Sequence, residues 1–273
     1  FHIGRFITYL KKEGLYENTI FIVTADNGPE GNDPSDHAPW REWFKTTIYD
    51  RDYETLGDQD SYVYIGTEFA QAMASPSHLF KFHMSEGGLR VPLIMSGPGI
   101  KKGKNHNFAF VTDIAATISD IVFDDVDGRI IGKSLQNSLA GSNENNYEDF
   151  EAVGLEVTGN SALFKGNYKI VRNRPPNGSN QWELYNLHED PGETQDLSKI
   201  MPDKLFELIE DYDQYAQING VVELPLDYQW AEEMTVNTFK RNYLPLLLRA
   251  VSVIALTVFV VIYLRRRWKK TQN

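Results

Sequence analysis

The segment TIFIVTADNGPEGND, residues 19–33, decides the fold assignment. Its apolar run, Ile20–Val23, is β-branched and aromatic, is too short for a helix, and is followed shortly by a Gly-Pro pair. We therefore predict a buried β-strand. Asp26 and Asn27 stand at the carboxyl end of this strand, and at that edge of open α/β sheets the loops line a ligand-binding crevice. This position makes both residues candidates for a functional site.

The segments on either side predict the helix–strand alternation of a doubly wound α/β sheet. Apolar residues recur at helical spacing through residues 3–15, with Gly14 where the helix would end. Val91–Ile100 predicts a second buried strand that ends in turn residues, and Phe110–Val122 has the apolar period of a helix. Helix, short turn and buried strand form the repeating unit of such sheets.

A long polar segment, residues 31–75, interrupts this pattern and is rich in Asp and Gly. We predict one helix within it, around residues 40–50, and otherwise irregular structure. Insertions of this length are usually functional loops, lids or disordered segments. The motif DPSDH, residues 33–37, has the composition of a metal cluster, but we interpret it as a solvated loop.

A different pattern begins near Ser134. Residues 150–187 hold short aromatic-rich runs separated by Gly, Asn and Pro, which predict the antiparallel strands of a small sheet. Lys204–Gly220 predicts an amphipathic helix with a glycine at its end. We therefore divide residues 1–232 into an α/β domain, residues 1–133, and a small α+β subdomain, residues 134–232.

The carboxyl-terminal residues contain a candidate transmembrane helix. Leu244–Leu264 is almost wholly apolar, and about 20 such residues match the ~30 Å hydrocarbon core of a bilayer. Residues 265–273 follow with five basic side chains, and by the positive-inside rule this tail lies in the cytoplasm and the preceding chain outside. Arg249 lies near the outer end, where it can reach the interface. The alternative is a buried core helix.

Charge and composition exclude several classes of function. Six of the 27 Lys and Arg residues lie at or after Arg249, which leaves 21 against 38 acidic residues before it, a net charge of −17. Such a charge argues against nucleic acid as a partner. The absence of cysteine excludes disulfides, thiolate zinc sites and a cysteine nucleophile within the chain. The chain begins with Phe1 and lacks a signal-peptide pattern, so we interpret it as the carboxyl-terminal part of a longer protein.

Three sequence blocks together carry a family resemblance. TIFIVTADNGPEG, SPSHLFKFHMSEGGLRVPLIMSGPG and WELYNLHEDPGETQDLS occur in this order. With them, residues 1–224 resemble the carboxyl-terminal half of the sulfatases in the alkaline-phosphatase-like superfamily, and bacterial arylsulfatases most of all. The resemblance implies part of a doubly wound mixed sheet, in which residues 1–133 are the last part of the catalytic domain. The small antiparallel-sheet-plus-helix subdomain and the transmembrane helix would follow it.

The resemblance implies a metal site at Asp26 and Asn27. In sulfatases an Asp-Asn pair at this strand end ligates one calcium or magnesium ion, and carboxylate and amide oxygens are ligands that Ca²⁺ prefers. Phosphatase and phosphodiesterase relatives generally carry Asp-His here and bind two zinc ions, so Asn27 favours a single oxygen-ligated ion. Without the other blocks, an Asx turn that binds no metal would be the default interpretation.

Lys81 is the catalytic residue that the resemblance implies. In the family, a lysine shortly before the Gly-Gly-x-Arg-Val-Pro block contacts the sulfate, where an ammonium group stabilises the oxygens on which charge collects. A lone lysine without that block would be interpreted as a solvated surface charge. We expect the two glycines, Gly87 and Gly88, to form a backbone turn that only glycine tolerates. We expect Arg90 to bind nearby acids.

Two further features near these blocks have no catalytic counterpart in the family. His78 and His83 flank Lys81, and we expect them to line a pocket or to be exposed. The motif HEDPGETQDL, residues 188–197, has turn chemistry that predicts a structural role.

The family's nucleophile has no counterpart in these 273 residues. Sulfatases use a Cys or Ser in a Cys/Ser-x-Pro-x-Arg signature, which a formylglycine-generating enzyme converts to formylglycine, and this pattern does not occur here. We expect this chain alone to be inactive and the intact protein to hydrolyse small aryl or alkyl sulfate esters. Its catalytic part would face the periplasm or the cell exterior. The alternatives are a phosphoesterase or phosphonate hydrolase of the same superfamily and a catalytically silent, membrane-anchored binding protein.

Overall fold

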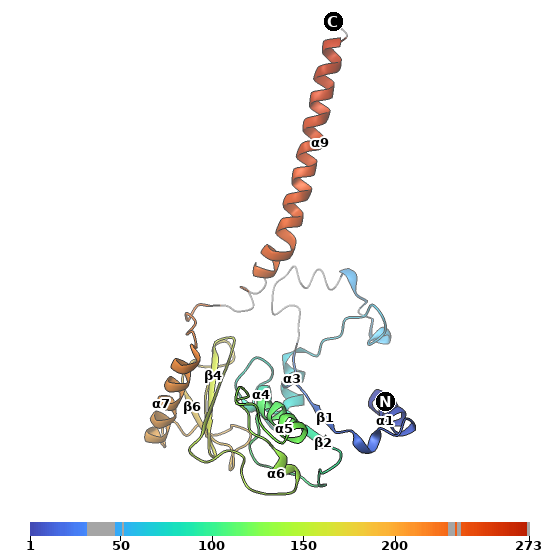
Figure 1. Ribbon diagram of the computed structural model, residues 1–273. Coiled ribbons are helices and arrows are strands. Elements are labelled where there is room, and N and C mark those ends of the chain that lie inside the picture. The colour runs from blue at the N-terminus through green and yellow to red at the C-terminus, as the bar shows by residue number, and fades with distance from the viewer. Residues whose placement is uncertain (32–46, 51, 229–232, 234–235, 272–273) are drawn as a thin grey trace. The chain divides into compact units, whose positions relative to one another are not determined.

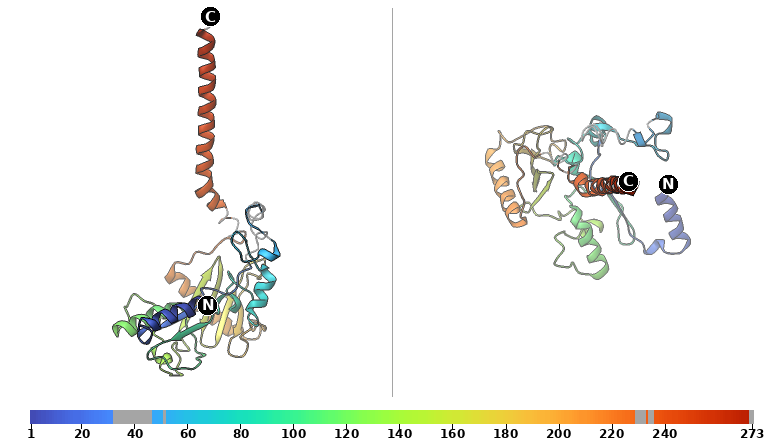
Figure 2. Two further views of the ribbon diagram at one scale, coloured as in Figure 1. Left: turned by 90° about the vertical axis from the view of Figure 1, so that its right-hand side faces the viewer. Right: turned by 90° about the horizontal axis from the view of Figure 1, so that it is seen from above.

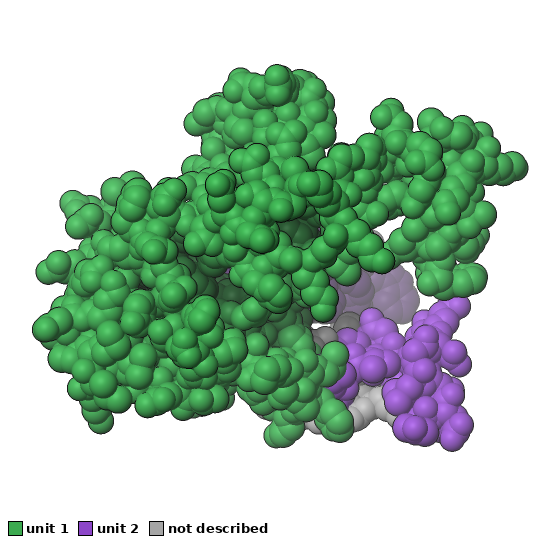
Figure 3. Space-filling model, turned by 90° about the horizontal axis from the view of Figure 1, so that it is seen from below, with its two compact units in different colours: residues 1–31, 66–222 green, residues 32–65, 223–273 purple. Residues whose placement is uncertain are grey.

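The computed structural model describes most of the chain, namely residues 1–31, 47–50, 52–228, 233 and 236–271 (Figure 1). Contacts divide the chain into two compact units, residues 1–31 with 66–222 and residues 32–65 with 223–273 (Figure 3). The DPSDH motif and most of the helix predicted around residues 40–50 lie outside the described residues. The domain boundaries predicted from the sequence stay predictions.

The first unit begins with a helix, a turn and a strand. Helix α1 (His2–Lys12) is followed by the 3-10 turn η1 (Tyr16–Asn18) and by strand β1 (Phe21–Thr24). Gly14 has a φ of +70° just after the helix, a conformation that glycine adopts without steric cost. Strand β2 (Leu93–Ser96) pairs with β1 in antiparallel orientation. The helix and both strands predicted for this region are therefore present.

Strands β1 and β2 are more exposed than the sequence predicts. Val23, Leu93 and Ile94 keep 39%, 37% and 61% of their surface exposed. Within the described part of the chain their sheet has only these two strands. A strand is buried by neighbours on its edges and by layers on its faces, so a two-stranded sheet leaves apolar side chains uncovered. The expectation of buried strands is wrong for these residues.

Helix α3 (Gly66–Ala74) lies in the segment that we predicted to be irregular, and that prediction is wrong here. Its apolar side chains contribute little burial, since Phe69 and Met73 are exposed and only Ala70 is fully buried. At the start of α3, the Gly66 N–H donates to the Gly31 carbonyl over 2.9 Å. The chain therefore leaves the first unit and returns to it at two residues that touch.

Helix α5 (Val111–Phe123) confirms the helix predicted at residues 110–122. Its buried Asp113 carboxylate accepts from the Phe110 N–H at 2.7 Å, the Lys133 N–H at 2.9 Å and the Tyr147 hydroxyl at 2.6 Å. Burial and the contact with Asp113 raise the pKa of the Tyr147 phenol. Two one-turn helices complete this part of the unit, α4 (Glu86–Leu89) and α6 (Gln136–Leu139).

A four-stranded antiparallel sheet follows, as the sequence predicts. Its strands run in chain order: β3 (Ala152–Val157), β4 (Asn160–Lys165), β5 (Tyr168–Arg172) and β6 (Glu183–Asn186). Helix α7 (Pro202–Asn219) packs against β3, β4 and β5 and ends at Gly220, whose φ is +65° (Figure 2). The predicted sheet-plus-helix arrangement is confirmed.

The two faces of this sheet bury different partners, because alternate residues of a strand point to opposite sides. One face and α7 form a buried cluster of Leu163, Ile170, Leu184, Leu208 and Tyr212. The other face forms a second cluster of Ala162, Val171, Tyr185 and Met84. Met84 lies just before α4, so this second face packs against the segment that carries Lys81.

The second unit contains a long carboxyl-terminal helix. A π-helical turn (Phe239–Tyr243) leads into α9 (Leu244–Thr271). The continuous helix Val236–Trp268 includes a window of mean hydropathy 2.5 that is entirely exposed. By length and composition this helix is able to cross a membrane, and the predicted span at residues 244–264 lies within it. The 3-10 turn η3 (Tyr53–Thr55) also belongs to this unit.

Candidate functional site

The turn after β1 presents Asp26 and Asn27. Asp26 is exposed. Asn27 is partly buried, and its amide nitrogen donates to the Gly28 carbonyl over 2.8 Å. This hydrogen bond holds the side chain in place and does not use its amide oxygen. The turn therefore carries one carboxylate and one amide oxygen on consecutive residues.

Lys81 lies against this turn although 51 positions separate it from Glu30. Its backbone N–H donates to the Pro29 carbonyl over 2.9 Å, and its ammonium forms an ion pair with Glu30, with 2.7 Å between Nζ and Oε2. The Gly28 N–H also donates to the Gly88 carbonyl over 2.9 Å. The structure thus brings the segment of Lys81 and the segment of Asp26 and Asn27 into direct backbone contact.

The glycines at this contact are required by crowding. A Cβ atom on Gly28 would lie 1.8 Å from the Gly87 carbonyl oxygen, and one on Gly87 would lie 1.9 Å from the Leu79 carbonyl oxygen. A Cβ on Gly88 would lie 2.3 Å from the His83 carbonyl oxygen. Only glycine is tolerated at Gly87 and Gly88, as we expected, but the two residues belong to helix α4 and have no positive φ, so the reason is close packing and the expected turn is wrong. Side-chain-free backbone is what lets the two segments approach.

Strained backbone surrounds Lys81. Leu79 and Phe82 have φ angles of +56° and +75°, which are uncommon for residues with a Cβ. The loop is closed by a hydrogen bond of 2.8 Å from the Gly87 N–H to the His78 carbonyl. Positive φ at non-glycine residues clusters at functional sites, where the surrounding structure enforces it. This signal is absent from the sequence pattern.

The two histidines of the loop differ in environment, as the expectation of pocket lining or exposure allows. His78 is exposed, whereas His83 is partly buried, with its Nδ1 3.0 Å from the Phe80 carbonyl oxygen. His83 Nε2 lies 3.1 Å from the amide nitrogen of Asn177, which can donate to it. Burial lowers the pKa of His83, and the nearby His78 adds to this effect, against the backbone hydrogen bonds that raise it. A neutral imidazole that donates from Nδ1 and accepts at Nε2 satisfies both contacts.

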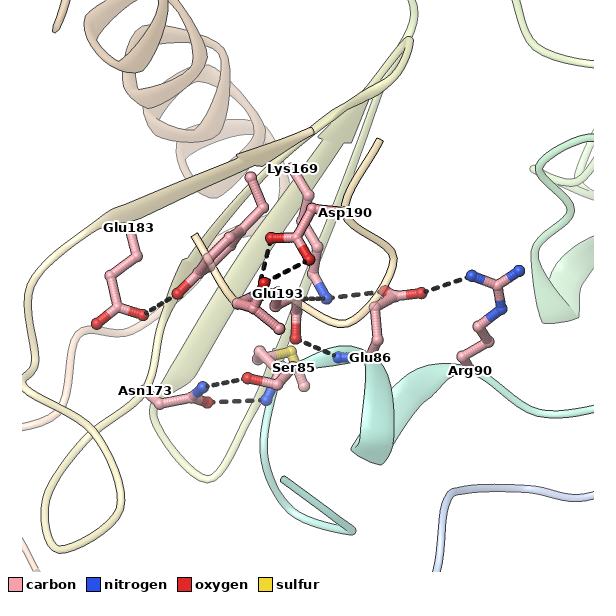
Figure 4. A network of polar contacts seen from close by, with 11 residues as sticks. Ser85, Glu86, Arg90, Lys169, Asn173, Glu183, Asp190 and Glu193 are labelled. Carbon is pink, nitrogen blue, oxygen red and sulfur yellow. Dashed lines mark hydrogen bonds and ion pairs between the residues drawn. The ribbon is translucent and has the colours of Figure 1, made fainter. Parts of the chain in front are cut away.

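A buried polar network supports the loop from the side of the small sheet (Figure 4). Arg90 lies 3.7 Å from Glu86, which confirms the predicted pairing of Arg90 with a nearby acid. The Glu86 carboxylate also accepts from the Lys169 ammonium, and the Glu86 N–H donates to the Glu193 carboxylate. Asn173 accepts from the Met84 N–H at 2.8 Å and donates to the Ser85 hydroxyl at 2.9 Å. Sequence reasoning did not single out Lys169, Asn173 or Glu193.

The metal-ligand chemistry is incomplete within the described residues. There, no three His, Asp or Glu side chains are grouped closely enough to hold a metal ion. Asp33, Asp36 and His37 lie outside the described part of the chain. The Asp26 carboxylate and the Asn27 amide are oxygen donors of the kind that calcium and magnesium bind, and the coordination sphere of these ions takes six or more oxygen ligands. The residues present therefore fit part of such a site.

Comparison with known proteins assigns the chain to a family. A model described as Sulfatase matches residues 1–124, and one described as N-sulphoglucosamine sulphohydrolase, C-terminal, matches residues 77–213, half of the chain. The chain belongs to the sulfatase family. The α/β fold class that we predicted is therefore confirmed, together with the carboxyl-terminal placement of the segment within sulfatases.

Individual relatives agree with this assignment. An uncharacterised sulfatase of Schizosaccharomyces pombe is 34% identical over 239 residues, which cover 83% of this chain and 43% of the relative. An N-acetylgalactosamine-6-O-sulfatase of Bacteroides thetaiotaomicron is 25% identical over 76% of this chain and 38% of its own length. A structure solved in complex with k-i-k-neocarrahexaose superposes with a TM-score of 0.56 at 18% identity, covering 89% of this chain and 45% of that one. This sulfatase chain spans less than half the length of each.

Proposed function

We propose that the intact protein hydrolyses sulfuric esters and that this chain contributes part of the active site. The observation that carries the proposal is the contact between two distant segments. Hydrogen bonds from Gly28 to Gly88 and from Lys81 to Pro29 join the turn of Asp26 and Asn27 to the loop of Lys81. Membership of the sulfatase family supplies the reaction class.

Each site residue has a proposed role. Asp26 and Asn27 would hold one divalent cation, calcium or magnesium, through a charged and a neutral oxygen. When bound, such an ion offsets the negative charge of the sulfate group and orients the reacting oxygens. Lys81 places an ammonium group where the sulfate oxygens gain charge as the ester bond breaks, and it stabilises them electrostatically.

The nucleophile is proposed to lie in a part of the sulfatase that this chain does not include. Family resemblance implies a formylglycine, made from a Cys or Ser by a formylglycine-generating enzyme. These residues span 43% and 38% of the two relatives described above, which is consistent with a half-site. On this proposal the chain alone does not turn over substrate.

Two classes of sulfate ester are candidate substrates. The acidic character of residues 1–243 favours a small aryl or alkyl sulfate over a polyanionic polymer, because like charges repel. A sulfated amino sugar is the second candidate, favoured by the names of the Bacteroides thetaiotaomicron relative and of the second matching family model. Helix α9 would anchor the protein in a membrane, with the catalytic part facing the periplasm or cell exterior and the carboxyl terminus in the cytoplasm.

The test uses the full-length protein, coexpressed with a formylglycine-generating enzyme. Hydrolysis of a chromogenic aryl sulfate, a 6-O-sulfated N-acetylhexosamine and an aryl phosphate is measured for wild type, Lys81→Ala and Asp26→Ala. We expect sulfate hydrolysis in wild type and a loss in kcat/KM of about 10²-fold or more in both variants, with folding intact. Lys102→Ala, at an exposed lysine, is the matched control and should keep wild-type activity. Chelation should abolish activity, and added Ca²⁺ or Mg²⁺ should restore it.

The same assay separates the alternatives. Turnover of the phosphate ester without sulfate hydrolysis would move the assignment to a phosphoesterase of the superfamily. No turnover of any ester, with formylglycine verified by mass spectrometry, would support a catalytically silent binding protein.

A further inference from the structure

A cluster of buried charged side chains in the first unit, Lys169, Glu86 and Glu193, is not among the site residues proposed above (Figure 4). The Lys169 ammonium is fully buried, 2.9 Å from Oε1 of Glu86 and 2.7 Å from Oε1 of Glu193. The two carboxylate side chains are 7% and 1% exposed. A buried ammonium group is stable only when charged partners with good geometry replace its water. These three residues therefore form one interdependent cluster.

This cluster is attached directly to the candidate site. The second carboxylate oxygen of Glu193 accepts from the Glu86 N–H over 2.8 Å. Glu193 therefore binds the main chain of Glu86 and also the Lys169 ammonium, which in turn binds the Glu86 carboxylate. Gly87 and Gly88 follow Glu86, and Gly88 accepts from the Gly28 N–H. A path of short contacts thus runs from strand β5 through Glu86 to the turn of Asp26 and Asn27.

The turn that supplies Glu193 is itself held firmly. Asp190 accepts from the backbone N–H groups of Thr194 and Gln195 at 2.7 and 2.8 Å. Glu193 has a φ of +55°, so its backbone adopts a conformation uncommon for a residue with a Cβ. A Cβ on the neighbouring Gly192 would come within 2.9 Å of the Pro76 carbonyl oxygen, so this turn also presses on the start of the Lys81 loop.

We propose that Lys169 and Glu193 are positioning residues of the sulfate site. By fixing Glu86 through its side chain and its main chain, they hold helix α4 and the Lys81 loop against the turn of Asp26 and Asn27. Neither residue contacts substrate on this account, and the inference rests on the proposed function. The motif HEDPGETQDL then has a role beyond its own turn, because its Glu193 sets the geometry of a site assembled from other segments.

The same sheet provides a matched comparison. Lys165 on β4 forms ion pairs with Asp211 at 2.7 Å and with Glu207 at 3.0 Å, both on helix α7. These pairs resemble those of Lys169 in type and in parent sheet, but they lie on the α7 side and have no contact with Glu86. A general loss of sheet stability should follow from disturbing either cluster, whereas a positioning effect should follow only from disturbing Lys169.

The experiment compares two charge-balanced double variants of the full-length protein. Lys169→Met/Glu193→Gln removes one cation and one anion and keeps an amide oxygen for the Glu86 N–H. Lys165→Met/Asp211→Asn is the control. Hydrogen–deuterium exchange is followed in peptides covering residues 26–31 and 78–90, and kcat/KM is measured with the chromogenic aryl sulfate. Glu193→Gln alone is the milder variant in case the first double variant does not fold.

The expected result is specific to one cluster. Exchange in both peptides should rise at least tenfold in Lys169→Met/Glu193→Gln, and kcat/KM should fall about 10- to 100-fold, the usual effect of removing outer support from a metal site. The control should stay within twofold in both measurements. Unchanged exchange in the two peptides, or an equal rise in the control, would overturn the inference. If wild type hydrolyses no sulfate ester, the proposed function fails, and the exchange data alone decide whether Lys169 and Glu193 hold the two segments together.

Discussion

Lys81 and Glu30 form an ion pair in which 2.7 Å separate Nζ from Oε2. The lysine side chain is 26% exposed and the glutamate 36%, so solvent reaches both groups. Glu30 belongs to the turn that follows Asp26 and Asn27. Its carboxylate therefore binds the same Lys81 ammonium that we propose to bind the sulfate group. An anionic substrate must compete with Glu30 for Lys81.

This competition predicts the effect of Glu30→Gln. Removal of a negative charge beside the sulfate position should lower KM for an aryl sulfate several-fold, because an anion is no longer repelled there. The free energy of unfolding should change by less than about 1 kcal/mol, as for other exposed ion pairs. Steady-state kinetics and urea denaturation of the full-length variant measure both quantities. An increase in KM would instead show that Glu30 orients Lys81 for binding.

Gly28→Ala should damage both stability and activity. The new methyl group would meet the Gly87 carbonyl oxygen at 1.8 Å, so backbone must move. Overpacking of this kind costs about 1–3 kcal/mol in the free energy of unfolding. We also expect kcat/KM to fall at least tenfold, since misplacement by about 1 Å is enough for such a loss.

The control for that prediction is Gly103→Ala, where a Cβ meets nothing within 4 Å. Thermal denaturation and aryl sulfate hydrolysis should be unchanged in this variant. If Gly28→Ala behaves like the control, then the contact between the turn and helix α4 does not constrain the site.

His83 predicts a pH dependence of stability. Burial lowers its pKa in the folded protein below the ordinary value of 6.5. As pH falls below 6.5, the unfolded chain binds a proton first, so the unfolded state is favoured and part of the stability is lost. His83→Gln removes this titrating group. Its free energy of unfolding should therefore fall less than that of wild type between pH 7.5 and pH 5.5.

Urea denaturation at the two pH values measures the difference. His78→Gln, at the exposed histidine of the same loop, should keep the wild-type loss. An identical loss in His83→Gln would mean that the contacts with Phe80 and Asn177 do not depend on the neutral imidazole.

Removal of residues 236–273 from the full-length protein tests the membrane proposal. The deletion takes away the long apolar helix, so the protein should move from the carbonate-resistant membrane fraction to the soluble fraction. Deletion of residues 269–273 alone keeps the apolar span and should leave the protein in the membrane fraction. Extraction of the intact protein by carbonate would contradict an integral anchor.

The fold was largely predictable because its signals are local. Strands β3 to β6 show short aromatic and β-branched runs between turn residues, and α7 combines an amphipathic period with Gly220 at its end. Helix α3 was not predicted, because only Ala70 of its apolar residues is buried and the sequence segment that precedes it is polar. The exposure of β1 and β2 was also missed, because burial depends on neighbouring strands that no local pattern describes.

Residues of the candidate site were predictable from the sequence only where they belong to a recognisable motif. Asp26, Asn27 and Lys81 follow from the family blocks, and their roles stay proposals. The partners of Lys169 lie 83 and 24 positions away in the sequence, and a lysine within an alternating strand is normally expected to face solvent. For Gly87 and Gly88 the need for glycine was visible, but its cause was not, since close approach of distant backbone leaves no local pattern.

The hydrogen bond between Gly31 and Gly66 has a consequence for how such proteins diversify. Because the chain departs and returns at touching residues, a change in the length or sequence of residues 32–65 should have little effect on the fold of residues 1–31 and 66–222. The entropy of closing a loop grows only with the logarithm of its length, so evolution can vary this segment at low thermodynamic cost.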